Sequence, residues 1–289
     1  MTLLDWPAEL PCPDADTLPL FAAASNICLD FHGDPAGANL AILSDGNHHM
    51  ALQECVQRFR ELHPDCVIFY ATTPPAPILK LLRRGRLRMG NLVLSVRPHL
   101  FLSPPHVLDT LADEGRISRR LSFMQNRGSA LLVRRGNPQQ IDLAALARPG
   151  IRLFLSNPDT EAVSFRGYRD TLLALARNQG IADDFLAAKE GRGEIVYGRL
   201  IHHREAPQAV ADGRADVAIL YYHLALRFCR VFPDLFKLVP LPGPGNRIGR
   251  IHAGLVGDGG PWGRQFLDFL AADEVTTIYR HHGLDRPAP

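Results

Sequence analysis

Short apolar runs alternate along this chain with stretches whose apolar residues recur every three or four positions. LAIL (40–43) is one such run, and Pro64 ends the helical pattern that follows it, whose apolar face is Leu52, Cys55, Val56, Phe59 and Leu62. Further strands are predicted at 66–70, 91–94, 99–102, 129–135, 151–155, 216–222, 236–241 and 250–256. Further helices are predicted near 104–112, 168–178, 204–212 and within 262–282. This alternation predicts an α/β fold with mostly parallel sheets.

Small polar residues stand where several predicted strands lead into helices. They are Ser44, Asp45, Gly46 and Asn47, then Thr72 and Thr73, then Ser164, then His202 and His203. Ligands of parallel sheets bind at the carboxyl ends of the strands, on these loops. A helix N-terminus offers unpaired N–H groups and a partial positive charge, so several such ends together can bind an oxyanion without lysine or arginine. The alternative is that each residue only caps its helix.

Two pairs of adjacent histidines occupy these loops, His48 with His49 and His202 with His203. With Asp45 they suggest a metal site, because neutral imidazoles bind zinc, copper and nickel. Adjacent side chains point apart, however, and do not normally share one mononuclear site. The other interpretation is that one histidine of each pair lines a ligand site and tunes its charge with pH, while its neighbour faces solvent. We therefore predict neither a metal nor a cofactor.

Composition and net charge limit the classes of partner that the chain is expected to bind. The chain has 289 residues, enough for one large domain or two modest ones, and its net charge of +2 argues for neither nucleic acid nor an anionic membrane. The basic run KLLRRGRLR (80–88) lies at the end of a predicted helix and is interpreted as a solvated surface. The longest apolar runs fall short of the roughly 20 residues that span a bilayer, so no membrane insertion is expected.

The N-terminal segment 1–38 is rich in proline and alanine and is predicted to be an arm packed on the surface or partly ordered. It does not resemble a secretory signal, so a cytoplasmic location is expected. The odd number of cysteines predicts no disulfide framework, which agrees with a reducing compartment. Four potential ligands in this region match no standard metal-binding pattern: Cys12, Cys28, Asp30 and His32.

No catalytic motif appears in its expected context. The chain lacks GxSxG, a P-loop, HExxH and a dinucleotide-binding GxGxxG, and GPGNRIG (243–249) precedes a strand, which is typical of a turn. We therefore predict a binding protein and not an enzyme. Three alternatives stay open: a histidine-lined site for a divalent metal or small organic anion, a histidine-dependent enzyme acting on such a ligand, and the effector domain of a regulator. Against the regulator, 38 N-terminal residues cannot readily hold a helix-turn-helix and a linker.

The order and spacing of the loops resemble the periplasmic molybdate-binding proteins of the type II solute-binding superfamily, from about Leu40 to Leu284. The clearest segment is HHREAPQAVADGRADVAILYYHLA (202–225), with a helix start, a turn, an apolar strand and a tyrosine. The segments that resemble the family elsewhere are YATTPP (70–75), SNPDTEAVSFRGY (156–168) and GPWGRQFLDFLAADEVTTIYRHHGL (260–284). The stretch MGNLVLSVR (89–97) has no counterpart in the family.

The resemblance implies a two-lobed fold of the type II periplasmic-binding-protein kind, with a ligand cleft at a hinge made of two crossing segments. Lobe one would be 39–124 plus 242–289, and lobe two 125–241. The implied anion contacts are Asn47, Thr73, Ser164 or Val163, the backbone N–H of His203, and the phenol of Tyr221, with Ser44, Thr72 and His48 beside them. The implied ligand is molybdate or tungstate first, then another tetrahedral oxyanion, bound by a sensor, a carrier or a relative of transport receptors. A protein partner is also expected for such a role.

Overall fold

The computed structural model describes residues 30–73, 75–89, 92–199 and 201–287, and the chain divides into two compact units. Unit 1 comprises Met1–Phe123 and Arg250–Ile278, and unit 2 comprises Met124–Gly249 and Tyr279–Pro289. The chain therefore passes between the units three times, where the sequence predicted two crossings. Residues 242–249 and 279–289 belong to unit 2 and not to the predicted lobe one.

Hydrogen bonds explain why these two segments belong to unit 2. The backbone of Asp285 exchanges two hydrogen bonds with Gln125, and its carboxylate accepts from Arg127. Asn246 accepts from the backbone N–H of Ser129 and donates to the carbonyl of the same residue. Long-range bonds of this kind leave no periodic signal in a sequence, so the boundaries could not be predicted from it.

Unit 1 is built on a six-stranded sheet in the order β1-β3-β2-β6-β13-β7. Its strands are β1 (Asp30–His32), β2 (Leu40–Ser44), β3 (Ile68–Thr72), β6 (Leu100–Ser103), β7 (Ile117–Gln125) and β13 (Arg250–Val256). The three central strands β3, β2 and β6 run parallel, whereas β1 and β13 pair antiparallel to them. A separate hairpin, β4 (Leu87–Met89) with β5 (Leu92–Leu94), occupies much of the stretch that has no family counterpart.

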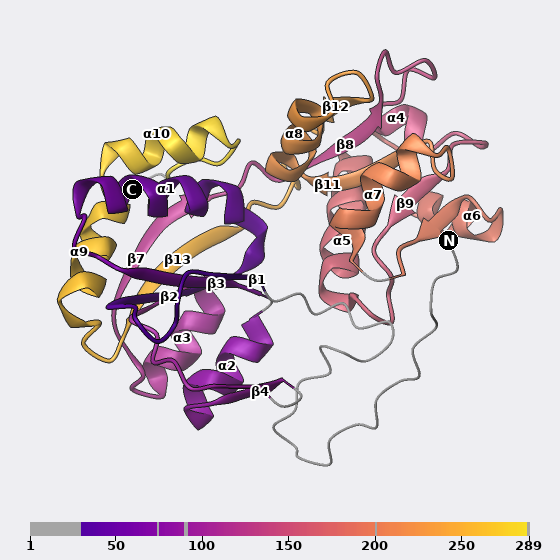
Figure 1. Ribbon diagram of the computed structural model, residues 1–289. Helices are drawn as coiled ribbons and strands as arrows, with labels where there is room; N and C mark the ends of the chain where they lie inside the picture. The colour runs from indigo at the N-terminus through magenta and orange to yellow at the C-terminus, as the bar shows by residue number, and fades with distance from the viewer. Residues whose placement is uncertain (1–29, 74, 90–91, 200, 288–289) are drawn as a thin grey trace, which may run out of the picture. The chain divides into compact units, whose positions relative to one another are not determined.

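Helices cover both faces of this sheet (Figure 1). On one face lie α1 (His49–Leu62) and α9 (Gly260–Leu270), joined by the contact of the Phe59 and Phe266 rings at 5.0 Å. On the other face α2 (Pro75–Arg84) and α3 (Pro105–Asp113) pack against a buried cluster that includes Leu43, Phe101 and Leu108. Because strand side chains alternate between faces, strands covered on both sides are apolar throughout, as LAIL is. Helix α10 (Asp273–His281) ends the element order.

Unit 2 is built on a five-stranded sheet in the order β10-β9-β11-β8-β12. Its strands are β8 (Ser129–Arg134), β9 (Leu153–Leu155), β10 (Ile195–Tyr197), β11 (Val217–Tyr221) and β12 (Phe236–Pro240). Its helices are α4 (Leu143–Leu146), α5 (Ala162–Asn178), α6 (Phe185–Gly191), α7 (His202–Ala211) and α8 (Tyr222–Val231). Helices α4, α5 and α6 share one apolar cluster with the sheet, in which Leu153, Leu172 and Ile219 are buried.

The predicted α/β class is confirmed, and one feature of the sheets differs from the prediction. Each sheet is mixed and not mostly parallel, because β8 and β12 in unit 2 and β1 and β13 in unit 1 run antiparallel to their neighbours. An antiparallel strand buried on both faces has the same apolar pattern as a parallel one, so periodicity does not reveal strand direction. The predicted arm 1–38 contributes β1 to the sheet, and its residues 1–29 lie outside the described part of the chain.

Two asparagine side chains hydrogen-bond the segments of unit 2 at which the chain enters and leaves this unit. Asn126 accepts hydrogen bonds at Oδ1 from the N–H groups of Gly128 (3.0 Å) and Gly249 (2.9 Å). Asn246 bonds Ser129 and also donates to the carbonyl of Leu241 at 2.8 Å. As predicted, GPGNRIG (243–249) forms a turn, and it contains Asn246, one of these two asparagines.

Candidate ligand-binding site

Four buried hydroxyl side chains gather at one edge of the unit 1 sheet. The parallel strands β2, β3 and β6 end there at Ser44, Thr72 and Ser103, and Thr73 follows β3. Ser44 is the register partner of Thr72, and the N–H of Thr73 donates to the carbonyl of Ser44 at 3.0 Å. All four are at most 2% exposed. The structure thus brings together the predicted residues Ser44, Thr72 and Thr73, although their role in binding stays a prediction.

The two histidines of the first pair have separate partners. His48 is buried, and its Nε2 lies 3.0 Å from Oγ of Ser44, which itself donates to the carbonyl of Asp45 at 2.9 Å. His49 is half-buried, and its Nδ1 lies 3.0 Å from the carbonyl of Gly46. His48 therefore contacts the hydroxyl edge at Ser44, whereas His49 contacts the turn before α1 at Gly46.

Asn47 lies in the single turn before α1, where it is half-buried. Its backbone N–H donates to Oδ1 of Asp45 at 3.0 Å. Burial raises the pKa of Asp45, and the hydrogen bond from Asn47 opposes that rise. The first predicted anion contact therefore has a carboxylate of the chain already at its N–H group.

Three buried hydroxyl oxygens in the described residues make no hydrogen bond: Oγ1 of Thr73, Oγ of Ser103 and Oγ of Ser156. Each follows or ends a parallel strand at its carboxyl end, in β3, β6 and β9 respectively. Nε2 of His252 is also buried without a hydrogen bond, and His252 lies on β13 as the register partner of Ser103. An unsatisfied buried polar group costs about 1–3 kcal/mol, so a protein rarely keeps one without a use.

The unit 2 sheet has a similar edge at the carboxyl ends of β9 and β11. Ser156 is fully buried after β9, and Tyr221 ends β11 opposite Ser129 of β8. The ring of Tyr168, from α5, lies 5.3 Å from that of Tyr221 and 5.1 Å from that of His202. These contacts place the starts of α5 and α7 beside the end of β11.

His202 is the first residue of α7 and is 1% exposed. Its ring stacks on that of Phe154 at 5.3 Å. Burial, reinforced by the neighbouring His203 and opposed by a hydrogen bond with the backbone of Phe154, lowers the pKa of His202 to about 3, so the ring is neutral near neutral pH. Its backbone N–H donates to Oε2 of Glu161 at 3.0 Å.

The predicted unit 2 contacts lie at three element ends. Ser164 is half-buried in the first turn of α5, and its neighbour Val163 is 78% exposed. His203 is the second residue of α7 and is half-buried, whereas the buried imidazole of this pair belongs to His202. Tyr221 is half-buried and stacks on His223 at 5.8 Å. Nothing tests whether these residues bind a ligand, and that role stays a prediction.

Sequence reasoning missed Ser103, Ser156, Glu161 and Tyr168. A signal for the two serines is present, because the tetrapeptide LFLS occurs twice, at 100–103 and 153–156, and its serine ends β6 in the first case and directly follows β9 in the second. Glu161 and Tyr168 carried no such signal. Their position depends on the packing of α5 against α7, which no local pattern encodes.

In the residues that the structure describes, no group of three or more His, Cys, Asp or Glu side chains is placed to hold a metal ion. Of the N-terminal candidates, Cys12 and Cys28 lie outside the described residues.

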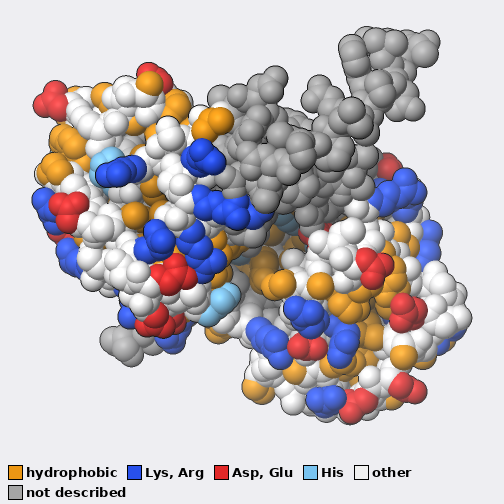
Figure 2. Space-filling view, turned by 90° about the horizontal axis from the view of Figure 1, so that it is seen from below, with side chains coloured by type: hydrophobic (Ala, Val, Ile, Leu, Met, Phe, Trp, Pro, Cys, Tyr) orange, Lys and Arg blue, Asp and Glu red, His pale blue; other side chains and the backbone are white. Residues whose placement is uncertain are grey.

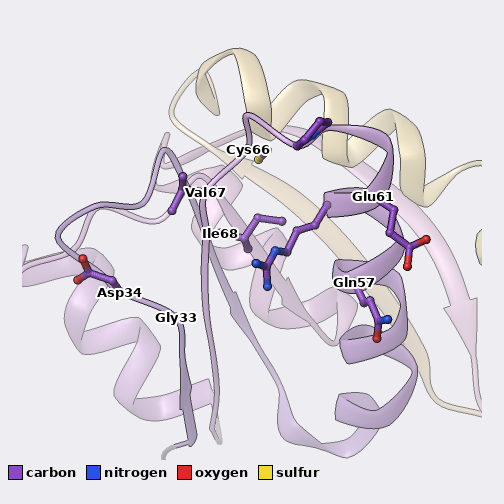
Figure 3. A pocket seen from close by; sticks show the side chains of 9 residues that line it. Gly33, Asp34, Gln57, Glu61, Cys66, Val67 and Ile68 are labelled. Atoms are coloured by element: carbon purple, nitrogen blue, oxygen red, sulfur yellow. The ribbon is translucent and has the colours of Figure 1, made fainter.

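A surface pocket of unit 1 lies away from the hydroxyl edge (Figure 3). It is lined by Asp34 and Gly33 after β1, by Gln57 and Glu61 of α1, and by residues Cys66, Val67 and Ile68 at the start of β3. Thr72 and Thr73 stand at the other end of β3. This pocket therefore belongs to the amino ends of the parallel strands, where ligands of such sheets do not usually bind.

Gly33→Ala is expected to lower the free energy of unfolding by about 2 kcal/mol. Gly33 has φ of +89°, and an added Cβ would lie 2.4 Å from the backbone oxygen of Ile68. Urea unfolding measures the loss. Gly37→Ala in the same loop is the matched control, since its Cβ would meet only the side chain of Asp34, at 3.0 Å. Equal stability of the two variants would show that β1 adjusts freely.

Figure 2 shows basic and acidic side chains interspersed among uncharged ones on the face in view. Among the helices of the described residues, none is both long enough and apolar enough to cross a membrane. The two hydroxyl edges themselves carry no lysine or arginine among the residues named above. Their donors are neutral hydroxyl, phenol, imidazole and backbone N–H groups.

One known protein family matches most of this chain. The family described as bacterial extracellular solute-binding protein matches residues 40–285. The chain belongs to this family. No curated protein matches the chain in sequence. The resemblance to solute-binding proteins is thereby confirmed at the level of the family, while molybdate as ligand is not.

Solved structures share the fold. The substrate binding domain of a putative molybdenum ABC transporter from Clostridium difficile is 12% identical with a TM-score of 0.63, over 86% of this chain and 99% of the other. The sulfate-binding protein SubI from Mycobacterium tuberculosis is 17% identical with a TM-score of 0.62, over 86% and 87%. PEB3 of Campylobacter jejuni, bound to L-phospholactate, is 17% identical with a TM-score of 0.60, over 86% and 99%. At such identities the likeness shows the two-lobed α/β fold alone.

Proposed function

We propose that this protein binds a small tetrahedral oxyanion reversibly, without chemical conversion. The observation that carries the proposal is the set of three buried hydroxyls without hydrogen bonds, Thr73, Ser103 and Ser156, at carboxyl ends of parallel strands. Oxyanion oxygens accept hydrogen bonds, and these hydroxyls have protons to donate. Molybdate and tungstate are the first candidates by resemblance, and related folds bind molybdate and sulfate.

Neutral donors suit such a ligand. In a buried setting a hydroxyl or N–H that meets a charged oxygen forms a hydrogen bond roughly twice as strong as a neutral one. A wrong ligand would leave one or more of these donors unpaired, at about 1–3 kcal/mol each. Selectivity would then follow from the number and placement of donors.

Thr73→Ala, Ser103→Ala and Ser156→Ala are each expected to weaken the preferred oxyanion about tenfold, because each removes one charge-assisted hydrogen bond. The stability of the unliganded protein should stay unchanged or rise, because each variant also removes an unsatisfied buried group. Calorimetric titration with molybdate, tungstate, sulfate, thiosulfate and phosphate measures the first effect, and thermal unfolding measures the second.

Thr277→Ala is the matched control, because its hydroxyl is exposed and donates to Asp273 within its own helix. Binding of none of the five anions, together with tight binding of a divalent metal, would contradict the proposed function. Unchanged affinity in all three serine and threonine variants would contradict the site.

We propose a role as a sensor, a carrier or a transport-receptor relative that meets a protein partner, as other solute-binding proteins often do. We further propose the cytoplasm as its location, which cell fractionation tests. Recovery with the cell envelope or in the medium would contradict that location.

A further inference from the structure

Carboxylates of the chain already occupy the start of α7, which alters the chemistry that this helix offers. Glu161 accepts the N–H of His202 at 3.0 Å, and Glu205 accepts the N–H groups of Arg199 (3.0 Å) and Ile201 (2.9 Å). The partial positive charge of this helix end therefore faces two negative groups. An added anion would meet a carboxylate here and not a set of free N–H donors.

Glu161 is held in place by its backbone. Its N–H donates to the carbonyl of Asn157 at 2.9 Å, and its carbonyl accepts from Phe165 in α5. The side chain of Asn157 in turn donates to the carbonyl of Gly198 at 3.1 Å. These three hydrogen bonds fix the backbone of the loop from which the Glu161 side chain reaches the start of α7.

Two buried side chains beside this helix start point to a ligand and not to a simple cap. Oγ of Ser156 makes no hydrogen bond, and Ser156 and His202 are both at most 1% exposed. The N–H group that donates to Glu161 is the backbone N–H of His202 itself. Ser156 begins the loop that carries Glu161. Buried polar atoms are normally hydrogen-bonded, so these atoms fit a ligand that carries both donors and acceptors.

An ionised carboxylate is an acceptor only. Against a fully deprotonated oxyanion it forms no hydrogen bond and adds charge repulsion. Against an oxyanion that keeps a proton, it accepts a short O–H···O⁻ hydrogen bond, among the stronger bonds in proteins. Near neutral pH, phosphate and arsenate keep at least one proton, whereas sulfate and molybdate keep none. Glu161 uses Oε2 for His202, which leaves Oε1 to accept such a proton.

We infer that Glu161 is a specificity-determining residue that selects proton-bearing oxyanions of the phosphate class over aprotic ones such as sulfate and molybdate. This inference rests on the proposed function and moves the preferred ligand from molybdate to phosphate. In unit 1, Asp45 stands in the same relation to the N–H of Asn47, at 3.0 Å. In each unit, a carboxylate of the chain thus accepts a backbone N–H at a helix start near the hydroxyl edge.

Calorimetric titration of the full chain at neutral pH with phosphate, arsenate, sulfate and molybdate tests the inference. Phosphate and arsenate are expected to bind about tenfold or more tightly than the two aprotic anions. In Glu161→Gln the amide supplies a donor in place of an acceptor, so this ratio should fall about tenfold or invert, with sulfate and molybdate gaining affinity. Asp159→Asn is the control, because it removes the same charge from an exposed position of the same loop.

Each outcome decides one of the two proposals. If the wild-type protein prefers sulfate or molybdate, the inference fails while oxyanion binding stands. The same holds if Glu161→Gln changes the affinity for all four anions by one common factor. If none of the four anions binds, the proposed function fails with it. The wild-type ratio needs no variant, so the test survives a Glu161→Gln protein that folds poorly, which circular dichroism would detect.

Discussion

Replacing Lys189 with methionine is expected to lower the free energy of unfolding by about 3–5 kcal/mol. The ammonium group of Lys189 on α6 is fully buried and donates to the carbonyls of Arg148 (3.0 Å) and Ile151 (2.6 Å) and to Oε2 of Glu194 (3.0 Å). Methionine fills the aliphatic space but leaves two carbonyls and a buried carboxylate without this donor. Urea unfolding followed by circular dichroism measures the loss.

The control variant changes Arg192, a second residue that donates to Glu194. Arg192 also donates to Oε2 of Glu194 at 3.0 Å, but its side chain is 38% exposed. Arg192→Gln should therefore cost less than about 1 kcal/mol, as exposed ion pairs do. Similar losses in the two variants would show that burial does not strengthen the Lys189 contact. The effect bears on the site because Glu194 also bonds Gly150 and Leu153, where β9 begins on its way to Ser156.

Acidification is expected to destabilise the protein through His202. Its pKa is about 3 in the folded chain and 6.5 as an ordinary histidine, so between these values only the unfolded state binds the proton. Stability from this group is complete above pH 6.5 and is lost as the pH falls toward 3, by on the order of 5 kcal/mol in total. Urea unfolding across this pH range measures the slope.

His202→Phe should remove most of that slope, because phenylalanine keeps the ring contacts with Phe154 and Tyr168 but cannot bind a proton. His106→Asn, at an exposed helix start, is the control for the loss of one histidine. Burial also lowers the pKa of His99 and His252, which contribute with the same sign. An unchanged slope in His202→Phe would contradict the role of His202 and assign the acid sensitivity to other groups.

The sequence predicted the scaffold of the site well because the scaffold follows local rules. Apolar runs such as LAIL and LFLS are strands, and the stripe from Leu52 to Leu62 is helix α1. The predicted residues Ser44, Thr72 and Thr73 meet at one edge because parallel strands of similar length end together. Periodicity encodes burial, and burial determines which segments become buried strands and amphipathic helices.

The sequence could not supply the partners of these residues. Tyr168 and Glu161 join the unit 2 edge only because tertiary packing brings α5 and its N-terminal end next to the start of α7. The same packing made His202, and not His203, the buried imidazole of its pair. Contacts between residues about 40 positions apart depend on the whole core, so no local pattern predicts them.

By itself, the sequence determined an α/β chain with hydroxyl-bearing loops after its strands, because residue size and polarity repeat with the period of each element. The tertiary structure alone decided which hydroxyls remain without partners and which helix starts are already met by a carboxylate. Those two facts turn the proposal of anion binding into a prediction about protonated ligands. They follow from long-range packing, which brings Glu161 to His202 and buries Ser156.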